Sequence, residues 1–220
     1  MKSKAKYLTQ IHDMAKFLKS MDLLEEFNPN PEKLGLNLAE IRKLSFEKLW
    51  KTHFAGNCYH FHLLDGALIN FNVESQSFSY FGNPFDCMTF TDFLHEHGYM
   101  DDSDKYVLGP DYEQYVSECA IKEFPFAIRY DYDETSYNEG LHPVSHLHLG
   151  INNSTRIGIK KLIDPEAFIY FIVRQLYPEY WQKVLQDSKQ ISRIEKAKSA
   201  MPAIENKYYN KKDQIELYLE

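Results

Sequence analysis

Histidine, aspartate and arginine gather in one stretch of this chain, between residues 129 and 148. Arg129 and Asp131 alternate within the run Arg-Tyr-Asp-Tyr-Asp, and His142, His146 and His148 follow after a short gap. Three of the nine histidines thus fall within seven positions. Neutral imidazoles beside a carboxylate and a guanidinium form a usable acid–base set, because histidine titrates near neutral pH and aspartate can fix its tautomer. The stretch therefore predicts a chemical site, although these residue types do not name a reaction.

Strand alternation predicts where the first of these side chains point. The segment 124–133 is typical of a strand, because its alternate positions form one continuous apolar face. That face would consist of Phe124, Phe126, Ile128, Tyr130 and Tyr132. Arg129 and Asp131 would then lie on the opposite face.

The same alternation applies to the segment 145–149. Leu147 marks its core face, so His146 and His148 share the opposite, solvated face. If the two strands pair, the two imidazoles meet the guanidinium and the carboxylate on one side of a sheet. A further strand over residues 155–160 would add Arg156 to this group.

Two further His-x-His pairs occur in the chain. His60 and His62 lie in a predicted strand and share one of its faces, whereas His95 and His97 flank an acidic residue in a loop-like region and are typical of surface positions. If the first pair faces the same cleft as the histidines of 145–149, four imidazoles would line that cleft.

Metal-independent cleavage of a phosphodiester bond, as in RNA, is the first chemistry that such a cleft predicts. His146 or His148 would act as the general base on a ribose 2′-hydroxyl. His142 or His60 would protonate the leaving oxygen. The remaining polar residues would assist, with charge stabilisation by Arg129 and Arg156 and orientation of an imidazole by Asp131.

Two alternatives remain open. A divalent transition metal such as zinc, nickel or iron could be held by His60, His62, His146 and His148. In the other alternative the histidines are structural, and the chain is a non-catalytic interaction module. In that case the helical ends of the chain would bind a partner.

The remaining pattern predicts a single α+β domain over residues 1–186, followed by a polar helical or mobile tail over 187–220. The domain would hold a mainly antiparallel sheet of about six strands, with helices from both ends packed on one face and a cleft over the other. Asp65-Gly66 predicts a hairpin between two of these strands.

Helical spacing predicts the surrounding elements. Apolar residues recur at helical spacing over 3–27 and again over 38–49. A helix is expected from Pro110 to Ala120, with the proline near its first turn, and another at Asp164-Pro165, where aspartate suits the N-cap and proline the first turn.

Composition excludes some classes of protein. The net charge of −7 argues against a protein coated in basic surface for duplex DNA. Three scattered cysteines without a Cys-x-x-Cys motif fit a reducing cytoplasm better than a disulfide framework. No run of about 18 apolar residues occurs, so neither a signal peptide nor a membrane span is expected.

The motifs of residues 124–180 resemble an uncharacterised bacterial family, annotated only as a domain of unknown function. The specific part is the string His-Pro-Val-Ser-His-Leu-His-Leu-Gly, which follows Arg-Tyr-Asp-Tyr-Asp. This order is also similar to small toxins of the TumE type from bacterial toxin–antitoxin pairs. The matching positions would be Arg129, Asp131, His142, His146 and His148. The resemblance implies a cytoplasmic toxin or defence effector that acts on RNA or a nucleotide and has an antitoxin as its protein partner.

Overall fold

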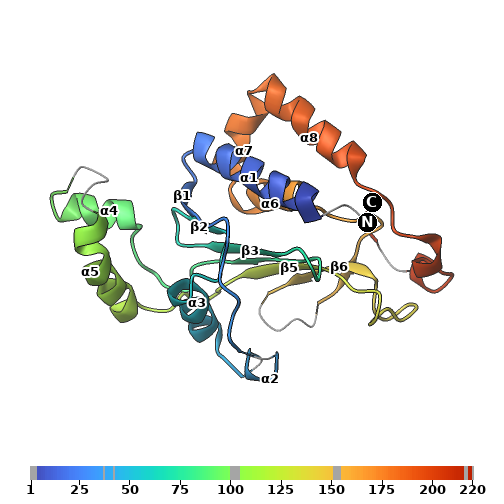
Figure 1. Cartoon of the computed structure of the whole chain (residues 1–220), viewed down its shortest axis with the longest axis horizontal. Coiled ribbons are helices and arrows are strands. Elements are labelled where there is room, and N and C mark those ends of the chain that lie inside the picture. Colours follow the sequence, from blue (N-terminus) through green and yellow to red (C-terminus); the bar gives the residue numbers. More distant parts are fainter. Residues whose placement is uncertain are drawn as a thin grey trace.

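A seven-stranded antiparallel sheet forms the centre of the molecule (Figure 1). The computed structural model describes residues 4–36, 38–41, 43–99, 105–150, 155–215 and 218–219. Each strand pairs with its neighbour in chain order, from β1 to β7. The strands are β1 (Leu24–Phe27), β2 (Phe61–Leu63), β3 (Leu68–Asn72), β4 (Ser77–Phe81), β5 (Ala127–Tyr132), β6 (Ser145–Leu149) and β7 (Ile157–Gly158). The expected α+β class is confirmed, with one strand more than the six expected.

The additional strand is β1, which replaces the end of the predicted N-terminal helix. Helix α1 (Lys4–Ser20) ends where Asp22 adopts a left-handed conformation with φ of 54°. The chain then reverses, and β1 pairs with β2. The prediction of a helix through residue 27 is therefore wrong beyond Ser20. Apolar residues keep helical spacing after Ser20, but this segment forms β1 at the edge of the sheet instead.

The hairpin between β2 and β3 is confirmed. Phe61 pairs with Ile69, and the Gly66 amide donates to the Leu63 carbonyl at 2.8 Å to close the turn. Gly66 adopts φ of +80°, and an added Cβ would come within 2.6 Å of the Asn83 side chain. Glycine is therefore required at this turn for both its conformation and its size.

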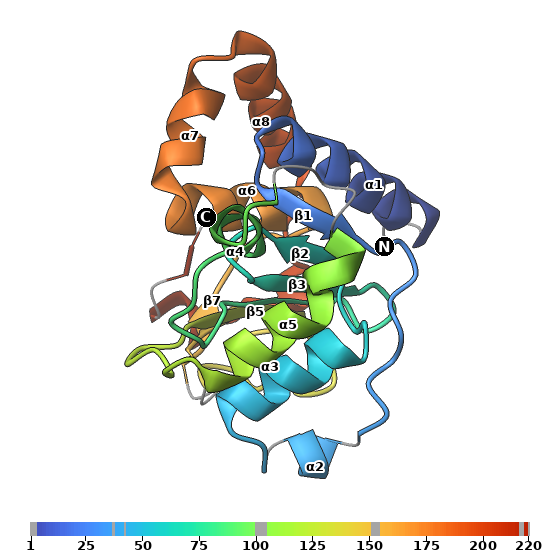
Figure 2. The same ribbon diagram turned by 90° about the vertical axis from the view of Figure 1, so that its left-hand side faces the viewer.

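Helices from both ends of the chain cover one face of the sheet, as expected. Helix α6 (Pro165–Leu176) packs with α1 on this face, and α7 (Pro178–Leu185) and α8 (Ser188–Ala200) pack against α6 (Figures 1 and 2). The predicted start of α6 is confirmed, because the Asp164 carboxylate accepts a hydrogen bond from the Ala167 amide at 3.0 Å. The main core lies between these helices and the sheet and includes Phe61, Phe78, Tyr130, Leu147 and Phe168.

The opposite face is only partly covered. The predicted helix over 38–49 is divided into α2 (Leu38–Ile41) and α3 (Phe46–Ala55), because the chain turns after Ile41 and restarts from Ser45. Trp50 of α3 packs on Leu68. Beside them lie α4 (Phe90–Glu96) and α5 (Lys105–Glu118). Pro110 lies inside α5, so the expectation that it occupies the first turn is wrong.

The described part of the segment after α8 packs against the last strands. It contains the short 3-10 helices η2 (Asn206–Tyr208) and η3 (Asp213–Ile215). Asp213 is 1% exposed and accepts hydrogen bonds from the Tyr137 hydroxyl and the Gly140 amide. These hydrogen bonds hold the loop between β5 and β6 against the segment after α8. Among the described residues, no helix is long and apolar enough to cross a membrane.

Candidate metal centre and adjoining cleft

The register of three neighbouring strands brings the predicted polar side chains together. Asp131 of β5 stands opposite His146 of β6, and Arg129 stands opposite His148. On the other side of β5, Ser77 of β4 stands opposite Asp131. All five side chains lie on the sheet face away from Leu147 and the main core, as strand alternation predicts.

Asp131 is the centre of this cluster. Its Oδ2 atom accepts a hydrogen bond from Arg129 Nε at 2.8 Å and lies 3.2 Å from His148 Nε2. Its Oδ1 atom accepts a hydrogen bond from the Ser77 hydroxyl at 2.6 Å. His146 Nε2 lies 3.0 Å from His148 Nε2 and 4.0 Å from Asp131 Oδ2. Three atoms that could bind a metal, Asp131 Oδ2, His146 Nε2 and His148 Nε2, therefore lie within 4.0 Å of one another.

The two histidines are buried, so the expectation of a solvated face is wrong at this point. The exposed fraction is 1% for His146 and 3% for His148. Burial, together with the neighbouring His148, lowers the pKa of His146 to about 4 even though Asp131 opposes the shift. Burial alone would raise the pKa of Asp131, but hydrogen bonds from His148 and Ser77 and the charge of Arg129 hold it well below its usual value. His146 is therefore neutral and Asp131 is charged at neutral pH.

Two imidazoles beside a charged carboxylate form a donor set that transition metals prefer. The donor atoms of Asp131, His146 and His148 all lie within 4.8 Å of one another. Ligand atoms around a four-coordinate zinc are about 3.3 Å apart, given metal–ligand distances of 2.0–2.1 Å. Two of the three separations, 3.0 and 3.2 Å, are already close to this value, and only the 4.0 Å separation would need to shorten.

The other nitrogen of each imidazole is an unusual feature of the cluster. Nδ1 of His146 and Nδ1 of His148 are both buried and make no hydrogen bond within the described part of the chain. Metal-bound histidines usually donate through this second nitrogen to a carboxylate, carbonyl or water. The pair is therefore oriented by its Nε2 contacts with each other and with Asp131.

His142 lies beside the cluster but not in it. Its ring centroid is 4.8 Å from that of His146, and its Nδ1 atom lies 2.6 Å from the Ser136 carbonyl. Nδ1 must donate in this pair, so Nε2 is the nitrogen available for other partners. His142 is half-buried, which makes it the most accessible histidine of the group.

Arg156 and the first His-x-His pair are not brought into the cluster. Alternation places exposed Arg156 on the same face as Gly158, which stands opposite His146. His62 shares that face but stands opposite Leu68, close to Phe54.

His60 also shares the sheet face but lies far from the cluster. His60 directly precedes β2, and β2 is four strand spacings from β6. The distance between His60 and the histidines of β6 is therefore about 19 Å. Its Nδ1 atom lies 2.9 Å from Asn70 Oδ1, and burial lowers its pKa to about 4. The hypothesis of four histidines around one metal is therefore wrong.

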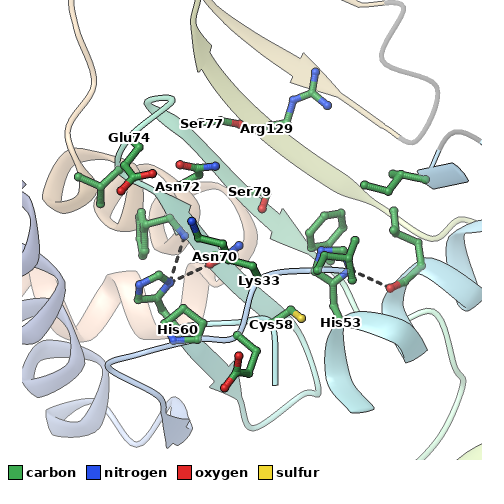
Figure 3. Close-up of a pocket in the computed structure, with 18 of the residues that line it drawn as sticks. Lys33, His53, Cys58, His60, Asn70, Asn72, Glu74, Ser77, Ser79 and Arg129 are labelled. Atoms are coloured by element: carbon green, nitrogen blue, oxygen red, sulfur yellow. Dashed lines mark hydrogen bonds between the residues drawn. The ribbon is translucent and has the colours of Figure 1, made fainter. Parts of the chain in front are cut away.

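A cleft of about 720 Å³ lies over the sheet between these two groups (Figure 3). Asn70, Asn72, Ser77, Ser79 and Arg129 form its polar floor. Among the described residues, the charged groups that line it are Lys4, Lys33, Arg129, Glu32 and Glu74, a sum of +1 in a chain of net charge −7. Asp131 lies beside this floor on the same sheet face, because two of its hydrogen-bond donors, Ser77 and Arg129, line the cleft.

Ser77, Ser79 and Asn70 were not predicted from the sequence as site residues. The signal was present, because Ser77 and Ser79 alternate with buried Phe78 and Tyr80 along one strand. Serine is common on exposed strand faces, so only the pairing of β4 with β5 distinguishes these two as neighbours of Arg129 and Asp131.

Comparison with known families accounts for most of the chain. The family described as "Uncharacterized conserved protein (DUF2290)" matches residues 27–212. The chain belongs to this family. The match includes β2 to β7 with Asp131, His146 and His148, and α6 to α8. No curated protein and no solved structure matches the chain. The DUF2290 assignment confirms the resemblance to a domain of unknown function, whereas the similarity to TumE-type toxins stays a prediction.

Proposed function

We propose that this protein is a metal-dependent phosphoesterase whose divalent transition metal is held by Asp131, His146 and His148. The observation that carries the proposal is the convergence of their three donor atoms within 4.8 Å. A buried pair of imidazoles beside a charged carboxylate is a chemically suitable donor set. A metal bound there would supply a Lewis acid next to the cleft.

Arg129 supports a phosphate ester as the substrate. Its Nε atom donates to Asp131, which fixes the guanidinium at the cleft floor, and its remaining N–H groups have no partner among the described residues and can donate to a ligand. The charges of Asp131 and Arg129 cancel, so a divalent metal would leave the site with about two positive charges. An anionic substrate would balance them.

Burial disfavours the metal-independent mechanism. A histidine that acts as general base must reach the proton that it removes, but His146 and His148 are almost inaccessible and their Nε2 atoms are turned toward each other. As nitrogen ligands beside the cleft floor, the same two residues need no direct contact with the substrate.

Metal binding by tag-free protein tests the proposal. Calorimetric titration with Zn²⁺ and Mn²⁺ is expected to give one site per chain, and Asp131→Asn or His148→Asn is expected to abolish it. The matched control is the His95→Ala/His97→Ala double variant, because this pair has the same spacing but lies at the end of α4, remote from Asp131 in sequence and fold. A His60→Ala/His62→Ala variant is also expected to retain the site.

Hydrolysis completes the test. Cleavage of bis(p-nitrophenyl) phosphate and of labelled single-stranded RNA is expected to stop in EDTA and to return when the metal is restored. RNA is included because the resemblance to TumE-type toxins implies it. Cleavage that persists in EDTA and needs His146 would support the metal-independent mechanism. Absence of metal binding by the folded protein would overturn the proposal.

A further inference from the structure

A row of hydrogen-bond donors crosses the floor of the cleft. Asn70, Ser79 and Arg129 stand opposite one another on β3, β4 and β5, and all three line the cleft (Figure 3). Neighbouring strands are about 4.8 Å apart, so the row spans about 10 Å. Its length is suited to a small organic ligand rather than to a single ion.

The donors of this row favour a ligand that is rich in acceptors. The Ser79 hydroxyl makes no hydrogen bond within the described residues, and Arg129 keeps N–H groups beyond the one that Asp131 engages. His60 Nδ1 accepts a hydrogen bond from the Phe71 amide, so the neighbouring Asn70 side chain donates one amide N–H to this nitrogen and keeps its second N–H. Phosphate oxygens meet these requirements, because a guanidinium and a hydroxyl both donate to them.

One end of the cleft is aromatic. Phe81 follows Ser79 by two positions on β4, and its ring lies 4.9 Å from that of His53 and 6.3 Å from that of Phe46. All three rings line the cleft. Opposite Phe81 on β5 is Ala127, whose small side chain leaves space beside the ring. A flat, apolar ring system fits such a surface.

We propose that the cleft binds a nucleotide unit, with its phosphate at Arg129 and Ser79 and its base against Phe81. Two positions along a strand span about 7 Å, which is comparable to the separation of base and phosphate in one nucleotide. The volume of about 720 Å³ lies within the range of small-ligand sites. This inference names the substrate class for the proposed function and rests on it, but nucleotide binding itself requires no metal.

Calorimetric titration of the full chain in EDTA tests the inference separately from catalysis. The probes are AMP, UMP, the corresponding nucleosides, inorganic phosphate and a single-stranded RNA hexamer. Nucleoside monophosphates are expected to bind at least about tenfold more tightly than either nucleosides or phosphate, because both ends of the cleft are then used. Tighter binding of the hexamer would identify an RNA chain as the source of the nucleotide, and equal binding would identify a free nucleotide.

Matched variants connect binding to the named residues. Arg129→Gln is expected to weaken AMP binding about tenfold and Phe81→Leu severalfold, since the first removes a charged donor and the second a stacking surface. The controls are Arg174→Gln and Phe171→Leu on α6, which covers the opposite face. Ser79→Ala is compared with Ser75→Ala in the exposed turn before β4.

Three results would overturn the inference. The first is no detectable binding of any nucleotide at millimolar concentration by folded protein. The second is equal affinity for AMP and inorganic phosphate, which would show that the aromatic end of the cleft does not contribute to binding. The third is unchanged binding by both Ser79→Ala and Phe81→Leu with intact melting curves. None of these results depends on whether the metal site or hydrolysis exists.

Discussion

Arg129 and Asp131 lie two positions apart on β5 and are joined by a hydrogen bond of 2.8 Å between Nε and Oδ2. The pair connects the buried histidines beside the cleft floor to the open cleft, because Asp131 contacts His148 while Arg129 lines the cleft. A change on one side of this pair is therefore expected to affect the other.

Asp131→Asn is expected to destabilise the protein. The carboxylate accepts hydrogen bonds from Ser77 and Arg129 and contacts His148. An amide cannot replace all of these acceptor interactions, so a loss of about 1–3 kcal/mol in the free energy of unfolding is expected. Urea denaturation measures it, with exposed Asp111→Asn as the control. Equal stability of the two variants would contradict the central role of Asp131.

His146→Ala and His148→Ala are expected to lower the melting temperature. The sequence placed both residues on a solvated face, where substitution would change stability little. They are buried instead, so truncation leaves a cavity and removes a polar contact, at a cost of about 1–3 kcal/mol each. Thermal denaturation in EDTA is the measurement. Exposed His95→Ala is expected to melt like the unmodified protein.

Stability is expected to fall as the pH drops from about 6.5 to 4. Burial lowers the pKa of His60 from 6.5 to about 4, so in this window the unfolded chain binds a proton that the folded chain does not. The contribution of His60 to the free energy of unfolding is fully present above pH 6.5 and is at most about 3–4 kcal/mol, since each pKa unit corresponds to about 1.4 kcal/mol. His146 contributes in the same direction.

Denaturation curves at several pH values test this dependence. His60→Gln removes the titrating group and is expected to reduce the slope of stability against pH. His95→Gln, at an exposed position, is the control and should keep the full slope. An identical slope in both variants would show that His60 does not stay neutral in the folded protein.

Gly158→Ala is expected to disturb the packing of the C-terminal tail on β7. An added Cβ would come within 2.7 Å of the Tyr218 ring, which is buried there. The ring must move, and overpacking of this kind costs about 1–3 kcal/mol. Limited proteolysis of the tail is expected to become faster. Gly98→Ala is a poor control because its φ is +80°, whereas Gly109→Ala in α5 meets no atom within 4 Å.

Local patterns in the sequence were sufficient to predict several features. The hairpin at Gly66 and the N-cap at Asp164 depend on a few adjacent residues, and both are confirmed. The opposite faces of Arg129 and Tyr130 follow from strand alternation, a property of a single strand. Such features are predictable because their cause is local.

Only the tertiary structure decided which polar residues meet and how buried they are. Alternation placed His60 and His146 on the same face correctly, but it carries no information on the number of strands between them. The participation of Ser77 depends on the pairing of β4 with β5, and the burial of His146 depends on what packs around β6. These relations join residues far apart in the chain. They arise from strand order and packing, which no local pattern encodes.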